Sequence, residues 1–348
     1  MFLVSLLLII LGTTVIYTSN ANLAIQQALF ATIGTLGYFG LKFFDYRLLK
    51  LFSRHIYIAI CLLLLIVFFL GIETRGSIRW IPLGFFNLQP SELAKLGLIL
   101  VLSHFWSTRL PTWKNIFLSL GILGIPALMV FRQPDLGTTL TLVSIWISII
   151  FAANLSFFKA AILIGVSTLL TPLVWSLLKT YQKVRLLSFL YPARDPLGVG
   201  YNVIQSTIAV GSGEIFGRGL GRGTQSRLQF LPEFRTDFIF AFIAEELGFL
   251  GSFIVLSLYS ILFILLFRSL FRSFDKFGEL IIVGVAGMFF FQIVVNIGMN
   301  IGIMPITGIT LPFLSYGGSS IITSLLSLGI VDSIIGLSQR KSSDFETD

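Results

Sequence analysis

Residues 280–331 contain no charged side chain, and this stretch constrains the fold more than any other feature of the chain. It is about twice as long as the ~20 apolar residues that a helix needs to cross a bilayer. Polar, proline and glycine residues interrupt it near its middle, at Asn300, Pro305, Gly308, Pro312, Gly317 and Gly318. We therefore expect two membrane-spanning helices, over 280–299 and 317–337, joined by an irregular segment.

The rest of the chain is built in the same way. Of its 348 residues, 55% are hydrophobic and only 11% are charged, which is too few charges for the surface of a soluble protein. Eight further apolar stretches predict helices over 2–19, 23–41, 56–71, 88–106, 115–131, 136–158, 160–178 and 238–267. The first stretch lacks the basic flank of a signal peptide, so we interpret it as a retained helix.

These patterns predict an all-α, polytopic membrane protein with about ten transmembrane helices. We expect a single domain over 1–341 and a short solvated tail over 342–348. One large polar loop, about 179–236, separates the seventh expected helix from the eighth. We see no internal repeat of the kind that many transporters contain.

Basic residues indicate the orientation in the membrane. Ten spans place both termini on one face, where the short connections and the tail contain Lys42, Arg47, Lys50, Arg54, Arg109, Lys114, Lys159, Arg268, Arg272, Lys276, Arg340 and Lys341. The short connections on the other face contain only Arg75, Arg79 and Arg132. By the positive-inside rule the termini are cytoplasmic and the large loop lies outside. The net charge of +8 is thus explained by topology, and we expect no nucleic-acid partner.

Cysteine and histidine usage excludes two kinds of site. Cys61 is the only cysteine, so the chain has no internal disulfide. His55 and His104 both fall near span ends on the same expected face, which argues against a histidine-based metal site.

Two charged residues fall where the bilayer should exclude them. The uncharged part of the fourth span, 96–106, is too short to cross a membrane, so the helix must begin near Pro90 and include Glu92 and Lys95. Their spacing of three places them on one helical face, where they can pair beside a polar cavity. The alternative is that Glu92 complements the helix N-terminus while Lys95 extends to the membrane surface.

Two aspartates lie at expected outer helix ends. Asp135 follows Pro134 at the start of the sixth span and could simply cap that helix. Asp237 begins the eighth span, which at about 45 Å is longer than the hydrocarbon core and must tilt, break or protrude. Local chemistry leaves open whether Asp237 is functional or a first-turn carboxylate that the helix dipole favours.

The outer loop contains closely spaced glycines and arginines. The glycines are Gly211, Gly213, Gly217, Gly219, Gly221 and Gly223, and the arginines are Arg218, Arg222 and Arg227. Such a stretch can bind an anion through backbone N–H groups and guanidinium groups, or it can be a flexible loop. It matches neither a dinucleotide-binding fingerprint nor a P-loop, so we expect no nucleotide cofactor.

Several segments together resemble one protein family. They are Arg79-Trp80-Ile81, Gln89-Pro90-Ser91-Glu92-Leu93-Ala94-Lys95, Gln133-Pro134-Asp135-Leu136-Gly137, Asp195-Pro196, Gly200 to Ser206, Gly223 to Ser226, Phe230 to Glu233, Thr236 to Phe240, Pro305 to Gly308 and Leu311 to Ser320. In this order they resemble the SEDS family (shape, elongation, division and sporulation) of peptidoglycan glycosyltransferases. The segments around Tyr201, Gln225 and Asn296 are more similar to RodA than to FtsW. Arg235 and Glu214 depart from the family pattern, which typically has His and Gly there.

The resemblance implies polymerisation of lipid II into glycan strands during cell elongation, in the bacterial cytoplasmic membrane, with an outward-facing site. It implies Asp237 as the catalytic carboxylate, a class B penicillin-binding transpeptidase and the elongation machinery as partners, and a divalent cation, Mg²⁺ or Mn²⁺, with unknown ligands. Substrate-binding roles are implied for Arg79, Trp80, Glu92, Lys95, Asp135, Arg185, Arg218, Arg222, Gln225, Glu233, Ser315 and Ser319.

Two functions from other classes compete with this expectation. A lipid II flippase or secondary transporter would have the same spans and buried charges. A structural scaffold for the transpeptidase would need no functional Asp237.

Overall fold

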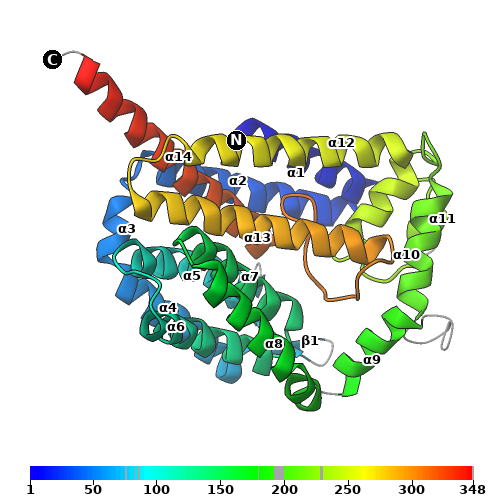
Figure 1. The fold of residues 1–348 in the computed structure, drawn as a ribbon. Coiled ribbons are helices and arrows are strands. Elements are labelled where there is room, and N and C mark those ends of the chain that lie inside the picture. Colours follow the sequence, from blue (N-terminus) through cyan, green and yellow to red (C-terminus); the bar gives the residue numbers. More distant parts are fainter. Residues whose placement is uncertain are drawn as a thin grey trace.

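The computed structural model describes residues 1–74, 77–82, 84, 87–178, 180–191, 200–227 and 230–346 (Figure 1). Its helices are α1 (Phe2–Ser19), α2 (Ala21–Phe43), α3 (Arg47–Leu51), α4 (Ser53–Leu70), α5 (Pro90–Ser107), α6 (Trp113–Arg132), α7 (Leu136–Ala152), α8 (Phe157–Leu177), α9 (Thr180–Leu190), α10 (Tyr201–Ser212), α11 (Thr224–Arg227), α12 (Ile239–Leu270), α13 (Lys276–Asn300) and α14 (Gly318–Glu346). Its strands are β1 (Ile72–Thr74), β2 (Ser77–Pro82) and β3 (Asn87–Leu88).

The described residues include seven helices that are long and apolar enough to cross a membrane: α1, α4, α6, α8, α12, α13 and the part of α14 up to Ser338. A helix also overlaps each of the other three ranges expected from the sequence, namely α2, α5 and α7. The protein is therefore a mostly helical, multi-pass membrane protein.

The structure adds elements that the sequence patterns did not indicate. The connection before α5 forms a small antiparallel sheet in the order β1-β2-β3, so the expectation of a purely α-helical chain was wrong in this detail. The outer loop, expected as one polar loop, contains α9, α10 and α11. The expected tail is helical as far as Glu346, because α14 continues to that residue. β1 and β3 have three residues and two, too short for a period-two pattern, and β2 ends on two successive apolar residues before Pro82, so its alternation is broken.

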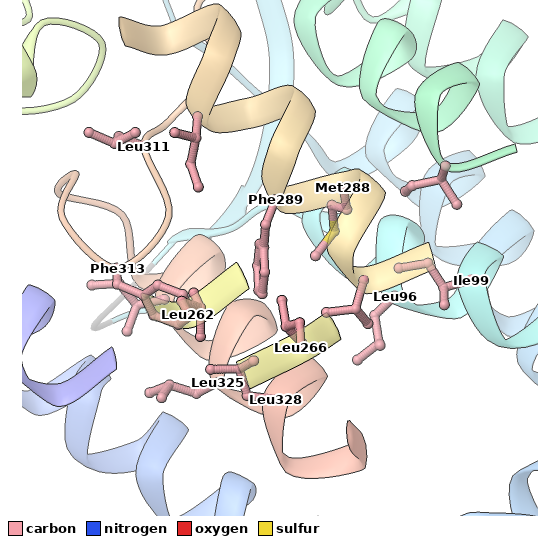
Figure 2. Close-up of a cluster of buried hydrophobic side chains, with 14 of the residues drawn as sticks. Leu96, Ile99, Leu262, Leu266, Met288, Phe289, Leu311, Phe313, Leu325 and Leu328 are labelled. Atoms are coloured by element: carbon pink, nitrogen blue, oxygen red, sulfur yellow. The ribbon is translucent and has the colours of Figure 1, made fainter. Parts of the chain in front are cut away.

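The core lies where α5, α12, α13 and α14 meet. Figure 2 shows Phe289 of α13 pointing towards leucines of α12 and α14, with Leu96 of α5 and Phe313 of the segment before α14 nearby. Phe289 and Phe313 are both at most 1% exposed, and their rings meet edge-on at 5.4 Å. In contrast, α8 is almost entirely exposed in the chain alone. The helices that bear the unusual polar residues are thus the central ones.

The connections gather at two opposite ends of the bundle. At one end Tyr46 donates to Asp275, and Lys276 Nζ donates to the carbonyl of Ala152 at 2.9 Å. Figure 1 shows α3 and the C-terminal end of α14 at this end, and α9, α10 and α11 at the other. The large loop therefore lies at the end opposite to the C-terminus.

The longest helix, α12, is broken at Gly248, whose backbone has φ 67° and ψ −159°. This break resolves the excess length expected for the eighth span. A Cβ at Gly248 would lie 2.3 Å from the backbone nitrogen of Gly217, so the two backbones touch at the break. Only glycine combines a positive φ with such close approach.

Candidate functional site

Glu92 and Lys95 form an ion pair in the first turns of α5, with 2.7 Å between Lys95 Nζ and Glu92 Oε2. Their side chains are 7% and 3% exposed. The pairing predicted from their spacing is confirmed, and neither side chain extends to the surface as the alternative required. Burial of both charges is tolerable because each compensates the other.

This pair lines a small polar cavity of about 30 Å³, which is room for about two water molecules. The cavity is lined by Gln89, Glu92, Lys95, Thr138, Thr141, Gln292, Gly308, Ile309 and Thr310. Among the described residues, Oε1 of Gln292 is buried without a hydrogen-bond partner, and so is Oγ1 of the neighbouring Thr307. Buried polar atoms are normally satisfied, so the cavity is suited to water or to a polar group of a ligand.

Asp135 caps α7 and also anchors the neighbouring segments. Its Oδ1 accepts from the backbone N–H of Thr138 at 3.1 Å, as the capping interpretation predicts. Its Oδ2 accepts from Nε2 of Gln89 at 3.3 Å, and Arg79 Nη1 lies 3.9 Å from Oδ1. Arg79 also donates from Nε to the carbonyl of Gln133 at 3.1 Å. Asp135 thus ties the β2 strand and the start of α5 to α7.

Asp237 lies in the turn that leads into α12, one residue before the N-cap residue Phe238. It is therefore not the capping residue of α12, although its location at the helix end agrees with the sequence. The turn is closed by the carbonyl of Glu233, which accepts from the N–H groups of Thr236, Asp237 and Phe238 at 3.1 to 3.2 Å. The side chain of Asp237 is half-buried.

The segment 307–310 separates Asp237 from the polar cavity. A methyl group on Gly308 would lie 3.6 Å from Oδ2 of Asp237, and Gly308 also lines the cavity. On its other side this segment packs on Gly137 of α7, since a Cβ there would lie 2.7 Å from the carbonyl oxygen of Thr307. Gly308 therefore lies beside the Asp237 carboxylate and also lines the cavity that contains the Glu92–Lys95 pair.

Two serines near the start of α14 fix the walls of the site. Ser315 Oγ donates to the carbonyl of Thr236 at 2.6 Å and accepts from the N–H of Leu311 at 2.8 Å. Ser319 Oγ accepts from the N–H of Gln89 at 3.0 Å. These serines therefore bind protein backbone, Ser315 at the turn beside Asp237 and Ser319 at the start of α5.

The glycine-rich loop wraps around the break in α12. The N–H groups of Arg218 and Gly219 donate to the carbonyls of Glu245 and Glu246, at 2.9 and 3.0 Å. The carboxylates of these two glutamates, at most 1% exposed, accept from the N–H groups of Gln225 and Gly221 at 2.8 and 2.7 Å. The sequence left open whether this loop binds an external anion or is simply flexible; in the structure these four backbone donors bind two glutamates of the chain itself.

The structure gathers the expected site residues into two groups. One group surrounds the cavity and the Asp237 turn: Arg79, Glu92, Lys95, Asp135, Glu233, Asp237, Ser315 and Ser319. The other group, Arg218, Arg222 and Gln225, lies at the α12 break, eight or more residues along the helix from Asp237, or about 12 Å. Trp80 is partly buried in β2 and is not among the cavity-lining residues. The backbone of Arg185 belongs to α9, and its side chain lies outside the described residues.

Sequence reasoning missed several residues of the cavity as site candidates. Gln89, Thr138 and Gly308 lie inside or beside the quoted motifs, but they were not assigned a role. Gln292 is the first side-chain amide of α13 and follows the wholly apolar run 280–291, and a polar residue in an apolar span was the signal that could have found it.

The chain is an integral membrane protein, because many of its helices are long enough to cross a membrane. Its polar site consists of a buried ion pair beside a polar cavity and a carboxylate at a helix end. The chain belongs to the FtsW/RodA/SpoVE family, because the model of that family, described as cell cycle protein, matches residues 1–340.

Relatives of known name agree with this assignment. The peptidoglycan glycosyltransferase MrdB of Escherichia coli K12 is 38% identical over 291 residues, covering 83% of this chain and 79% of the relative. Stage V sporulation protein E of Bacillus subtilis is 38% identical and covers 94% of each chain. The peptidoglycan glycosyltransferase RodA of Treponema pallidum is 33% identical and covers 96% of each.

Solved structures have the same fold. A chain of a peptidoglycan synthase complex that coordinates polymerization and crosslinking superimposes with a TM-score of 0.85, at 32% identity and 97% coverage of each chain. The rod shape determining protein RodA of Thermus thermophilus superimposes with a TM-score of 0.72, at 28% identity, covering 96% of this chain and 95% of that one. The chain therefore has the fold of the Thermus thermophilus RodA protein as well as sequence similarity to several members of the family.

Proposed function

We propose that this chain is a peptidoglycan glycosyltransferase that polymerises lipid II into glycan strands during cell elongation and shape maintenance. The observation that carries the proposal is the position of Asp237, half-buried at the end of α12 and in contact range of Gly308 at the border of the polar cavity. The names of its relatives support the same activity.

Asp237 would act as the general base of the transfer. It would take the proton from the acceptor hydroxyl as that oxygen forms its bond to the anomeric carbon of the donor sugar. The bond between this carbon and the pyrophosphate oxygen breaks at the same time, and the lipid pyrophosphate leaves with the electron pair. A carboxylate at the membrane surface suits this chemistry because both substrates are anchored in lipid.

The leaving pyrophosphate needs positive charge nearby. Arg218 and Arg222 are exposed on the large loop at the α12 break, about 12 Å along the helix from Asp237, and their guanidinium groups would supply this charge to a pyrophosphate that extends towards the break. Lys95 would contribute its charge from inside the cavity, balanced by Glu92.

A divalent cation, Mg²⁺ or Mn²⁺, fits the site only if phosphate oxygens of the substrate supply some of its ligands. Within the part of the chain that the structure describes, no group of three or more His, Cys, Asp or Glu side chains could hold a metal. Magnesium is commonly held by one or two carboxylates together with substrate phosphates. Asp237 and Glu233, in the same turn, are the carboxylates that would hold it, and the cation would neutralise charge on the departing pyrophosphate.

We further propose that ten helices cross the cytoplasmic membrane, namely α1, α2, α4, α5, α6, α7, α8, α12, α13 and α14. The basic connections share one end of the bundle, as the contacts of Tyr46 with Asp275 and of Lys276 with Ala152 indicate. By the positive-inside rule this end is cytoplasmic and contains both termini. Asp237 and the large loop would then face the outside.

The partner of this chain would be a class B penicillin-binding transpeptidase of the elongation machinery. The solved peptidoglycan synthase complex supports this proposal, since its matching chain covers 97% of this one.

The decisive experiment is polymerisation of purified lipid II by the protein in complex with its transpeptidase. We expect wild-type protein to make glycan strands, and Asp237→Asn to remain folded and inactive. Polymer formation by the Asp237→Asn complex at the wild-type rate would refute the assignment of the base.

A lipid flippase remains the alternative from another class, because buried charges such as the Glu92–Lys95 pair also occur in transporters. A flippase would move fluorescent lipid II across liposome membranes without making polymer. Intact cell-wall synthesis with Asp237→Asn would instead support a scaffold.

A further inference from the structure

The first turn of α12 is capped from a different helix. Phe238 occupies the N-cap position and cannot accept a hydrogen bond through its side chain. An N-cap side chain normally accepts from the second or third N–H group of the helix. Here Oδ1 of Asn300, in the last turn of α13, accepts from the N–H of Ala241 at 2.9 Å. Asn300 therefore replaces the missing cap.

Asn300 also acts together with Asn296 on the backbone of Asp237. The Nδ2 groups of both asparagines donate to the carbonyl oxygen of Asp237, at 3.1 and 2.9 Å. Their spacing of four residues places both on one face of α13. Both asparagines are fully buried. Two amides therefore hold one carbonyl, where a single backbone donor is usual.

Asn296 links the same carbonyl to the segment beside the cavity. Its Nδ2 has two hydrogens, and the amide also donates to the carbonyl of Ile309 at 2.7 Å. Ile309 follows Gly308, at which a Cβ would lie 3.6 Å from Oδ2 of Asp237. One side chain thus fixes the distance between the Asp237 backbone and the segment next to its carboxylate.

We propose that Asn296 and Asn300 are positioning residues that hold Asp237 in its reactive orientation. The proposal rests on the function proposed above, in which Asp237 is the general base. Neither asparagine need touch the substrate. Displacing a reacting group by about 1 Å can cost about 100-fold in rate, so loss of either amide should lower kcat by about 10- to 100-fold. The KM for lipid II should change by less than about twofold, since no substrate contact is removed.

The test uses Asn296→Leu and Asn300→Asp in the complex with the transpeptidase. Asn296→Leu has nearly the same shape and removes both donated hydrogen bonds. Asn300→Asp keeps an acceptor for the Ala241 N–H, so α12 stays capped. It removes the Nδ2 donor to the Asp237 carbonyl and, with it, the bonds of the same Nδ2 to the carbonyl and Oδ1 of Asn296. Rates are measured per mole of monodisperse protein after size exclusion, together with the melting temperature.

The control variant is Ser119→Ala. Ser119 Oγ accepts from the indole N–H of buried Trp146 at 2.9 Å, in the packing of α6 against α7. Its loss leaves a buried donor unpaired, which is a stability cost of the same kind. We expect Ser119→Ala to lower the melting temperature and to leave kcat unchanged.

The outcomes separate the two proposals. A fall in kcat for both asparagine variants at nearly constant KM supports the positioning role. A wild-type kcat in Asn300→Asp would overturn it. A fall in kcat in Asn296→Leu that is no larger than the fall in kcat in Ser119→Ala would also overturn it. If Asn296→Leu does not fold, Asn300→Asp alone decides. An inactive wild-type complex would refute the proposed function instead.

Discussion

The buried pair of Glu92 and Lys95 allows a quantitative test of the environment inside the bundle. Replacing Glu92 by Gln or Lys95 by Met removes one charge at nearly constant volume and leaves the other charge buried and unpaired. Replacing both removes the charges together. Because 93% or more of each side chain is buried at an ion-pair distance of 2.7 Å, the single variants should suffer more than the double variant.

The magnitude follows from the cost of neutralising the remaining group. Adding a proton to an ordinary glutamate at pH 7 costs about 4 kcal/mol, and removing one from an ordinary lysine costs about 5 kcal/mol. These values are upper limits for the penalty, because an unpaired charge that costs more is simply neutralised. They agree with the about 3–5 kcal/mol that breaking a buried pair typically costs.

The assay is the apparent melting temperature of detergent-solubilised protein, read from the monodisperse size-exclusion peak after heating. A loss of about 4 kcal/mol corresponds to a decrease of roughly 5–6 °C for a chain of 348 residues. We expect each single variant to show this decrease and the double variant to recover at least half of it.

The chain contains a matched control on its surface. Lys276 and Glu279 have the same spacing of three and a distance of 2.9 Å, but their side chains are 35% and 38% exposed. Solvent screens such a pair, so Glu279→Gln should cost about 0.5 kcal/mol or less. If Glu92→Gln is as mild as Glu279→Gln, or if the double variant is worse than both single variants, the reasoning about the buried pair is wrong.

Two further predictions concern backbone contacts near the site. A Cβ at Gly248 would lie 2.3 Å from the Gly217 nitrogen, so Gly248→Ala should cost several kcal/mol of stability. The control Gly121→Ala, in the open middle of α6, should stabilise the protein by about 0.5–1 kcal/mol. Equal melting temperatures of the two variants would contradict the close contact. Ser315→Ala should cost about 1–3 kcal/mol because the N–H of Leu311 and the carbonyl of Thr236 both lose their partner. Ser327→Ala, whose Oγ bonds only to its own helix, should cost less in the same melting assay, and the reverse order would refute this account.

The sequence alone predicted local features well. Apolar stretches such as 280–299 indicated helices because the bilayer requires about 20 apolar residues for one crossing. The spacing of Glu92 and Lys95 predicted their pairing, since residues three apart share a helical face. The excess length of the eighth span predicted a tilt, a break or a protrusion, and the structure contains the break, at Gly248.

The glycine-rich loop shows where such reasoning stops. Its glycines and arginines are compatible with an anion site, and its N–H groups do bind carboxylates. The partners are Glu246 and Glu245, which lie 25 residues along the chain from Gly221 and 20 from Gln225, respectively. Composition shows that donors are present, but it cannot show which acceptor reaches them.

What the sequence determined by itself is the helical membrane class, the pair on α5 and the place of Asp237 at a helix end, because each depends on residues within a few turns of one another. The resemblance of its motifs added the function. Only the tertiary structure decided that Gly308 of the segment before α14 lies beside the Asp237 carboxylate, and that Asn296 and Asn300 of α13 hold its backbone. These contacts join residues about 60 to 70 positions apart, and packing between helices, not any local periodicity, brings them together.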